Sequence, residues 1–266
     1  MFLVMDTSGS MAGAAIDNAR KAAESVVKRL QDTDTFALVT FSSDADLLVA
    51  SGPIGPRRKE VLERIRTVEA VGGTNISAGL DLAYGEARHA QTLPGGDNAV
   101  SVALLLSDGQ ATAGDTNANA LAARSSQAFQ EGIQTSAFGV GTQFDAPLMS
   151  TVADRGAGGY YFLADSSQIA KALATELDAR LRPVATAVEL RVRLGDGVVP
   201  TKVYGSKQLS QVESMAVRAQ EVAIDQREAA KKDIAQDRQE DTQSGMRFFL
   251  PAFAAADKHA TLLEVR

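Results

Sequence analysis

One carboxylate and two hydroxyl side chains lie close together near the start of the chain, where residues 6–10 read Asp-Thr-Ser-Gly-Ser. An apolar run precedes them and predicts a buried strand, so Asp6, Ser8 and Ser10 are expected in the loop that leaves its carboxyl end. We expect Gly9 to let the backbone turn tightly enough to aim both serines at one point. Hard oxygen ligands of this kind suit Mg²⁺, Mn²⁺ or Ca²⁺, and neutral hydroxyls leave such a cation able to attract an incoming acid.

Two further segments supply an oxygen at the same rim of a predicted sheet. Thr74 follows a glycine pair and precedes a predicted helix, and Asp108 lies in the run Ser-Asp-Gly at the end of an apolar strand. In an open α/β sheet the ligand crevice lies outside the carboxyl ends of the strands, where the strand order reverses. If the first strand and the strand before Asp108 are neighbours there, Asp6 and Asp108 face one crevice. Loops of this composition can also simply cap helices, because Ser, Asp, Thr and Asn are common N-cap residues.

Together these three segments resemble the metal-ion-dependent adhesion site (MIDAS) of the von Willebrand factor type A (vWA) domain, and the resemblance covers residues 1–182. It implies five metal-binding residues: Asp6, Ser8, Ser10, Thr74 and Asp108. The three hydroxyls would coordinate the cation directly, and the two carboxylates would act largely through bound water. The resemblance also implies two states that differ in whether the threonine binds the metal directly, with movement of the last helix of the domain passing that change to the tail.

The elements that must position these residues follow an alternating rhythm. Short apolar runs alternate with longer amphipathic stretches through the first two thirds of the chain, which predicts βα units on a parallel sheet. Strands are expected at 2–5, 35–42, 45–50, 100–107, 133–140 and 160–163, and helices at 12–30, 57–69, 75–89, 117–131, 146–154 and 166–180. Only two residues separate the second and third strands, so these two should form an antiparallel hairpin at one edge. The predicted fold is a doubly wound, mostly parallel α/β sheet with one antiparallel edge strand.

The alternation of predicted strands and helices ends at an Arg-Pro pair, and residues 183–266 are predicted to form a second, small β-rich module. Strands at 184–194 and 198–204 should pair through a glycine-containing turn. A long helical insertion is expected at about 207–243, followed by strands at 246–253 and 260–265. This tail resembles, more loosely, the region that follows the domain in bacterial vWA proteins.

Composition excludes several classes of protein. The 266 residues include 27 Lys and Arg against 33 Asp and Glu, a net charge of −6, and the basic residues form no cluster suited to nucleic acid. The absence of cysteine removes disulfides, zinc–thiolate sites and thiol nucleophiles. No apolar run approaches the roughly 20 residues of a membrane span, and no signal peptide is visible. We expect a cytoplasmic protein if the chain is complete, and a cell-surface or periplasmic one if it is a trimmed segment.

The resemblance predicts a divalent-cation-dependent protein-binding module for adhesion or assembly, without catalytic turnover. Its partner would be a protein that supplies a Glu or Asp side chain to the metal. One alternative is a metal-dependent hydrolase or phosphotransferase that activates water between Asp6 and Asp108. No general base is apparent for it, because His89 and His259 are interpreted as surface residues, and no P-loop is present. Another alternative is an assembly subunit that works with a chaperone-like ATPase.

Overall fold

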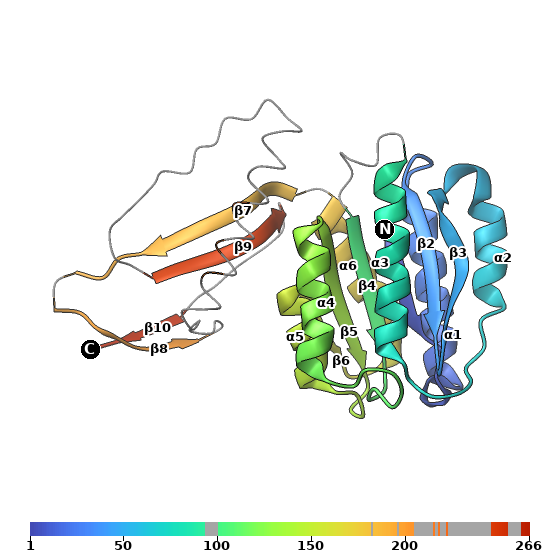
Figure 1. The fold of residues 1–266 in the computed structure, drawn as a ribbon, viewed down its shortest axis with the longest axis horizontal. Coiled ribbons are helices and arrows are strands. Elements are labelled where there is room, and N and C mark those ends of the chain that lie inside the picture. Colours follow the sequence, from blue (N-terminus) through green and yellow to red (C-terminus); the bar gives the residue numbers. More distant parts are fainter. Residues whose placement is uncertain are drawn as a thin grey trace. The chain divides into compact units, whose positions relative to one another are not determined.

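The computed structural model describes residues 1–93, 101–181, 183–195, 197–204, 215, 218, 222, 246–254 and 262–266. The chain divides into two compact units, Met1–Asp178 and Ala179–Arg266. Each unit is described by itself below, and Figure 1 shows the elements of both.

The first unit is built on a six-stranded sheet with the order β3-β2-β1-β4-β5-β6. Its strands are β1 (Phe2–Asp6), β2 (Thr35–Phe41), β3 (Ala45–Pro53), β4 (Ser101–Ser107), β5 (Ile133–Val140) and β6 (Ala157–Leu163). Central β1 pairs in parallel with both β2 and β4, whereas β3 runs antiparallel to β2 at one edge. The predicted doubly wound, mostly parallel sheet with one antiparallel edge strand is therefore confirmed.

In the described part of the first unit, six α-helices cover the two faces of this sheet (Figure 1). They are α1 (Ala14–Arg29), α2 (Arg58–Arg66), α3 (Ile76–Thr92), α4 (Ala118–Gln130), α5 (Ala146–Arg155) and α6 (Ile169–Leu181). Helices α1, α2 and α6 pack in one hydrophobic cluster with Leu3 and Met5, and helices α3, α4 and α5 pack in a second cluster with Phe2 and Val4. Successive side chains of a strand point to opposite faces, so a sheet covered on both sides needs uninterrupted apolar strands. This is why the strand predictions held at β1 and β4.

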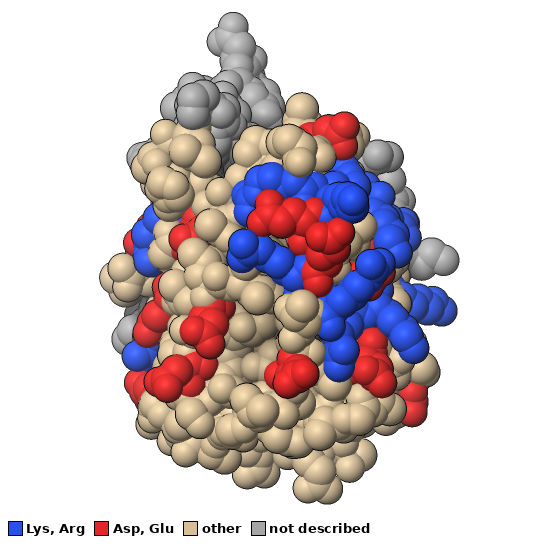
Figure 2. All heavy atoms as spheres, turned by 90° about the vertical axis from the view of Figure 1, so that its right-hand side faces the viewer, with Lys and Arg blue, Asp and Glu red and all other residues tan. Residues whose placement is uncertain are grey.

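Charged side chains cover the outer surface of the helices beside the β3 edge. Figure 2 shows this face, where Lys and Arg lie among Asp and Glu rather than apart from them. Arg66 and Lys28 both contact Glu24, and Arg58 contacts Asp32. The face is therefore of mixed charge, with exposed ion pairs that each contribute little to stability.

The second unit differs from its prediction in how its strands pair. β7 (Pro183–Val192) pairs antiparallel with β9 (Met246–Ala254), and β8 (Pro200–Tyr204) pairs antiparallel with β10 (Leu262–Val265). The expected hairpin between the first two strands of this unit is wrong. Seven residues, 193–199, connect them instead of the predicted three-residue turn at 195–197, so local geometry does not force the two strands together, and each is paired by a later strand. The result is two small two-stranded sheets.

The expected helical insertion at 207–243 lies outside the described residues except at three positions. Met215, Arg218 and Val222 are helical there. Within the described ranges, no helix is both long enough and apolar enough to cross a lipid bilayer.

Candidate metal site

The strand order brings the two predicted acidic residues to one rim. β1 and β4 are hydrogen-bonded neighbours, with Met5 opposite Leu106. Asp6 therefore ends its strand beside Ser107, whose hydroxyl donates a hydrogen bond of 2.5 Å to the Asp6 Oδ2. For Asp6 and Asp108 to face one crevice, β1 and β4 had to be neighbours at the point where the strand order reverses. They are, because the order of the strands in the sheet departs from the sequence order between β1 and β4.

Asp6 is a fully buried carboxylate. Its Oδ1 accepts a 2.7 Å hydrogen bond from the backbone N–H of Ser8, and no Lys or Arg in the described part of the chain forms an ion pair with it. Burial raises the pKa of Asp6 from 3.8 to about 6, and the two hydrogen bonds from Ser107 and Ser8 only partly oppose this shift. A nearby cation would offset the cost of keeping this carboxylate charged.

A chain of hydroxyls links the first loop to Asp108. The Oγ atoms of Ser8 and Ser10 lie 3.0 Å apart, and the Ser10 hydroxyl donates a 2.6 Å hydrogen bond to Asp108 Oδ1. Ser8 is buried and Ser10 is exposed, so the chain runs from the interior to the surface. Burial also raises the pKa of the Asp108 carboxyl. Oxygen atoms from two loops that are about a hundred residues apart in sequence thus meet at one rim.

The tight turn in this loop does not depend on the glycine that the sequence suggested. Gly9 is absent from the residues with positive φ, and a Cβ placed on it would meet only the Gly72 carbonyl oxygen, at 3.5 Å. Gly72 has φ 78°, a value that disfavours other residues, and its carbonyl accepts a 3.0 Å hydrogen bond from the Gly9 N–H. The backbone freedom of glycine is therefore used in the loop before Thr74.

Thr74 is buried, and its backbone is held from both sides by Thr112. The Thr74 N–H donates to Thr112 Oγ1 at 2.9 Å, and the Thr112 N–H donates to the Thr74 carbonyl at 2.9 Å. Asn75 caps helix α3 by accepting a 3.1 Å hydrogen bond from the Ala78 N–H. Capping therefore falls to Asn75 rather than to Thr74.

A glycine keeps open the space between the hydroxyls. A Cβ placed on Gly109 would lie 3.3 Å from both Ser10 Oγ and Thr74 Oγ1. These two hydroxyls thus flank a space that any other residue at this position would enter. Nowhere in the described ranges do three or more His, Cys, Asp or Glu side chains gather into a metal site, so a cation here would need the hydroxyls. Hydroxyl and carboxylate oxygens gathered at one rim fit a hard divalent cation.

Four of the five predicted residues form one hydrogen-bonded group: Asp6, Ser8, Ser10 and Asp108. The fifth, Thr74, lies beside this group, because its hydroxyl and that of Ser10 both flank Gly109. Sequence reasoning missed the contributions of Ser107 and Thr112. Ser107 belongs to a motif that was recognised, and its place opposite the end of β1 could be inferred once the strand order is known. Thr112 lies in a loop without a distinctive pattern, and no sequence signal marks it.

A doubly wound sheet with oxygen-bearing loops at the carboxyl ends of its central strands defines an α/β domain of the open-sheet class. Residues 1–175 match the model of the von Willebrand factor type A domain. The chain belongs to this family.

Several relatives share the domain. An Escherichia coli K12 protein, "Uncharacterized protein YfbK", is 29% identical over 194 residues, which are 72% of this chain and 33% of that protein. Inter-alpha-trypsin inhibitor heavy chain H4 from Sus scrofa is 32% identical over 150 residues, 55% of this chain and 16% of its own length. The chain thus spans a third or less of the length of these curated relatives.

Two solved structures share the fold. A von Willebrand factor type A protein from Catenulispora acidiphila superposes with a TM-score of 0.62 at 22% identity and covers 76% of this chain and 47% of its own. Proximal thread matrix protein 1 from the mussel byssus gives a TM-score of 0.53 at 22% identity and covers 66% of this chain and 44% of its own.

Proposed function

We propose that the first unit binds a divalent cation at the rim formed by the β1, β4 and α3 loops, and that this cation recruits an acidic side chain of a protein partner. In this proposal Ser8, Ser10 and Thr74 hold the cation through their hydroxyls. Asp6 and Asp108 supply the negative charge. Mg²⁺ is the cation we propose, with Mn²⁺ or Ca²⁺ as substitutes.

The observation that carries the proposal is the approach of two hydroxyls from separate loops, Ser10 Oγ and Thr74 Oγ1, to within 3.3 Å of the position that a Cβ on Gly109 would occupy. Three neutral ligands and two carboxylates leave a divalent cation only just neutralised, and an incoming carboxylate can then bind it favourably. The exposed position of Ser10 gives such a group a path from solvent. One of the solved structures of the mussel byssus protein carries zinc in its MIDAS motif, which supports a cation at the equivalent rim of this chain.

The proposed role is binding without turnover. vWA domains usually serve as binding modules, and here the buried Asp6 is engaged by Ser8 and Ser107 rather than by a water-activating base. The partner is proposed to be a protein whose Glu or Asp reaches the rim.

Calorimetric titration of chelator-stripped protein with Mg²⁺ and with Mn²⁺ tests the proposal. We expect saturable one-to-one binding, tightened when an excess of acetate is present because acetate imitates the partner's carboxylate. The Ser10→Ala variant should lose this binding, whereas Ser150→Ala, which removes a hydroxyl that bonds only its own helix at Pro147, should keep it. Absence of heat at millimolar cation, or equal binding by both variants, would overturn the assignment. Cation-dependent turnover of a generic phosphate ester or peptide would favour the enzyme alternative.

A further inference from the structure

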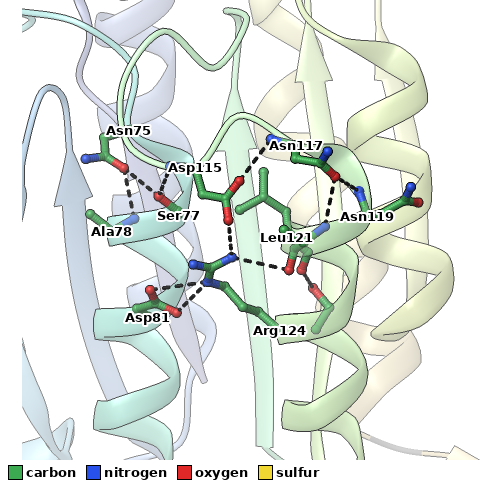
Figure 3. Close-up of polar contacts among 11 residues, drawn as sticks. Asn75, Ser77, Ala78, Asp81, Asp115, Asn117, Asn119, Leu121 and Arg124 are labelled. Atoms are coloured by element: carbon green, nitrogen blue, oxygen red, sulfur yellow. Dashed lines mark hydrogen bonds and ion pairs between the residues drawn. The ribbon is translucent and has the colours of Figure 1, made fainter.

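An arginine on α4 connects two elements next to the candidate metal site (Figure 3). The Arg124 Nε lies 3.1 Å from Asp81 Oδ1, on α3, and its Nη1 lies 3.0 Å from Asp115 Oδ2, in the loop after β4. The same Nη1 donates to the carbonyl of Ala120, one turn earlier. The guanidinium is thus fixed by three acceptors on α3, on α4 and on the loop.

The loop that Arg124 holds runs alongside the start of α3. The Asp115 N–H donates to Ser77 Oγ at 3.0 Å, and the Ser77 hydroxyl donates to Asn75 Oδ1 at 2.8 Å (Figure 3). Gly114 has φ 64°, and a Cβ there would come within 2.1 Å of Asn75 Oδ1, so the loop backbone passes as close to α3 as it can. At the other end of the loop, Thr112 makes two hydrogen bonds with the Thr74 backbone, and the Ala113 N–H donates a third, of 3.2 Å, to the Thr74 carbonyl.

These contacts form one continuous path from Arg124 to a proposed metal ligand. The residues 112–115 contact residues 74–77 at both ends, through Thr112 at the rim and through Asp115 farther along. At the Asp115 end, Ser77 accepts from the backbone N–H, and Arg124 ties the carboxylate to α3 and α4. We propose that Arg124 is a positioning residue for the metal site: it holds the loop 112–115 against α3 and thereby fixes the Thr74 hydroxyl beside the space at Gly109. This inference rests on the proposed function.

The loss of cation affinity on replacing Arg124 depends on the fraction of time that the loop 112–115 remains correctly placed. The side chains of Arg124, Asp115 and Asp81 are 31%, 33% and 57% exposed, so their ion pairs contribute little to global stability. If the untied loop is correctly placed only a tenth to a fifth of the time, the apparent cation affinity falls by about fivefold to tenfold, because the dissociation constant scales with the inverse of the competent fraction. Metal binding should therefore respond more strongly than folding does.

The test compares two arginine variants that differ in position but not in kind. Arg124→Gln removes the proposed tie. Arg88→Gln is the matched control, since Arg88 on α3 pairs with Glu131 at the far end of α4, at 2.6 Å. Mg²⁺ dissociation constants would be measured calorimetrically on the full chain, together with the melting temperature of the metal-free proteins. Amide hydrogen exchange at the Thr74 N–H, which bonds Thr112 Oγ1, reports directly on the loop.

Arg124→Gln should raise the Mg²⁺ dissociation constant about fivefold to tenfold and accelerate exchange at Thr74, whereas Arg88→Gln should stay within about twofold of wild type in both. Asp115→Asn should have the same effect as Arg124→Gln, and the double variant should add little more, because both residues act through one contact. Equal affinity of Arg124→Gln and wild type, equal effects of both arginine variants, or unchanged exchange at Thr74 would overturn the inference. Failure of the wild-type protein itself to bind Mg²⁺ would instead overturn the proposed function.

Discussion

Replacing the buried Asp6 with asparagine should stabilise the metal-free protein while it removes metal binding. Asn resembles the protonated carboxyl in shape: its Oδ1 can accept from the Ser8 N–H, and its amide can donate to the Ser107 oxygen. What it removes is the buried negative charge. Each pKa unit corresponds to about 1.4 kcal/mol, so the rise from 3.8 to about 6 means that the ionised carboxylate costs the folded state about 3 kcal/mol above pH 6.

The pH dependence of stability shows which of the two proteins is the more stable. The folded protein holds the Asp6 proton more tightly than the unfolded chain, so the wild-type free energy of unfolding falls as pH rises from about 4 to about 6 and then stays low. The Asp6→Asn variant lacks this loss. At pH 8 its free energy of unfolding should exceed that of wild type by about 3 kcal/mol, which corresponds to a melting temperature roughly 6–12 °C higher. Near pH 4 the two proteins should be equally stable.

Urea unfolding in the presence of chelator, at pH 8 and at pH 4, measures both differences. Added Mg²⁺ should raise the stability of wild type at pH 8 and leave the variant unchanged, since only the protein that binds the cation is stabilised by it. Asp46→Asn, at an exposed carboxylate on β3, serves as the control and should change stability little at either pH. An Asp6→Asn variant less stable than wild type at pH 8, or a stability difference that is the same at both pH values, would contradict the assignment of an uncompensated buried charge to Asp6.

Three other outcomes are expected. Gly109→Ala should weaken Mg²⁺ binding at least about tenfold in calorimetry, because the added methyl group enters the space between two hydroxyls. Its far-ultraviolet circular dichroism should stay unchanged, because the φ of Gly109 is not positive, and full affinity for Mg²⁺ would exclude this space as the site. Mg²⁺ affinity should fall below about pH 6, where protons compete for the Asp6 carboxylate, and an affinity independent of pH between 5 and 8 would argue against its participation. Leu105→Asp should leave no folded first unit by circular dichroism, since it places a charge in a strand that is fully buried, and a cooperative thermal transition near that of wild type would contradict the packing described for β4.

The sheet could be predicted from the sequence because its rules are local. Strands β1 and β4 are apolar on both faces, and the short connection between β2 and β3 requires a hairpin. The residues of the candidate site could be named because each lies where a predicted strand ends or a helix begins. The grouping of the first loop with Asp108 then followed from a single condition, that β1 and β4 are neighbours, whereas Thr74 is placed by the α3 loop and its contacts with Thr112.

Other features depend on contacts between distant segments and leave no local pattern. The sixth strand is predicted only from residue 160, after the glycine-rich stretch 156–159, but β6 already begins at Ala157. A Cβ on Gly158 would come within 2.0 Å of the Thr135 carbonyl on β5, so this glycine permits close strand pairing rather than a turn. The contacts of Thr112 and the pairing of β7 and β8 also depend on distant segments, since nothing near these residues in the sequence specifies what they contact.

The strand order also determines what a bound cation would do mechanically. One half of the sheet, β1 to β3, carries Asp6, Ser8 and Ser10, and the other half, β4 to β6, carries Asp108. The halves meet only along the β1–β4 pair, and the candidate site lies at the end of that seam. A cation held there would act as a removable cross-link between two halves of one sheet. A change that separates the ends of β1 and β4 would then weaken cation binding, and a bound cation would oppose that separation to the same extent.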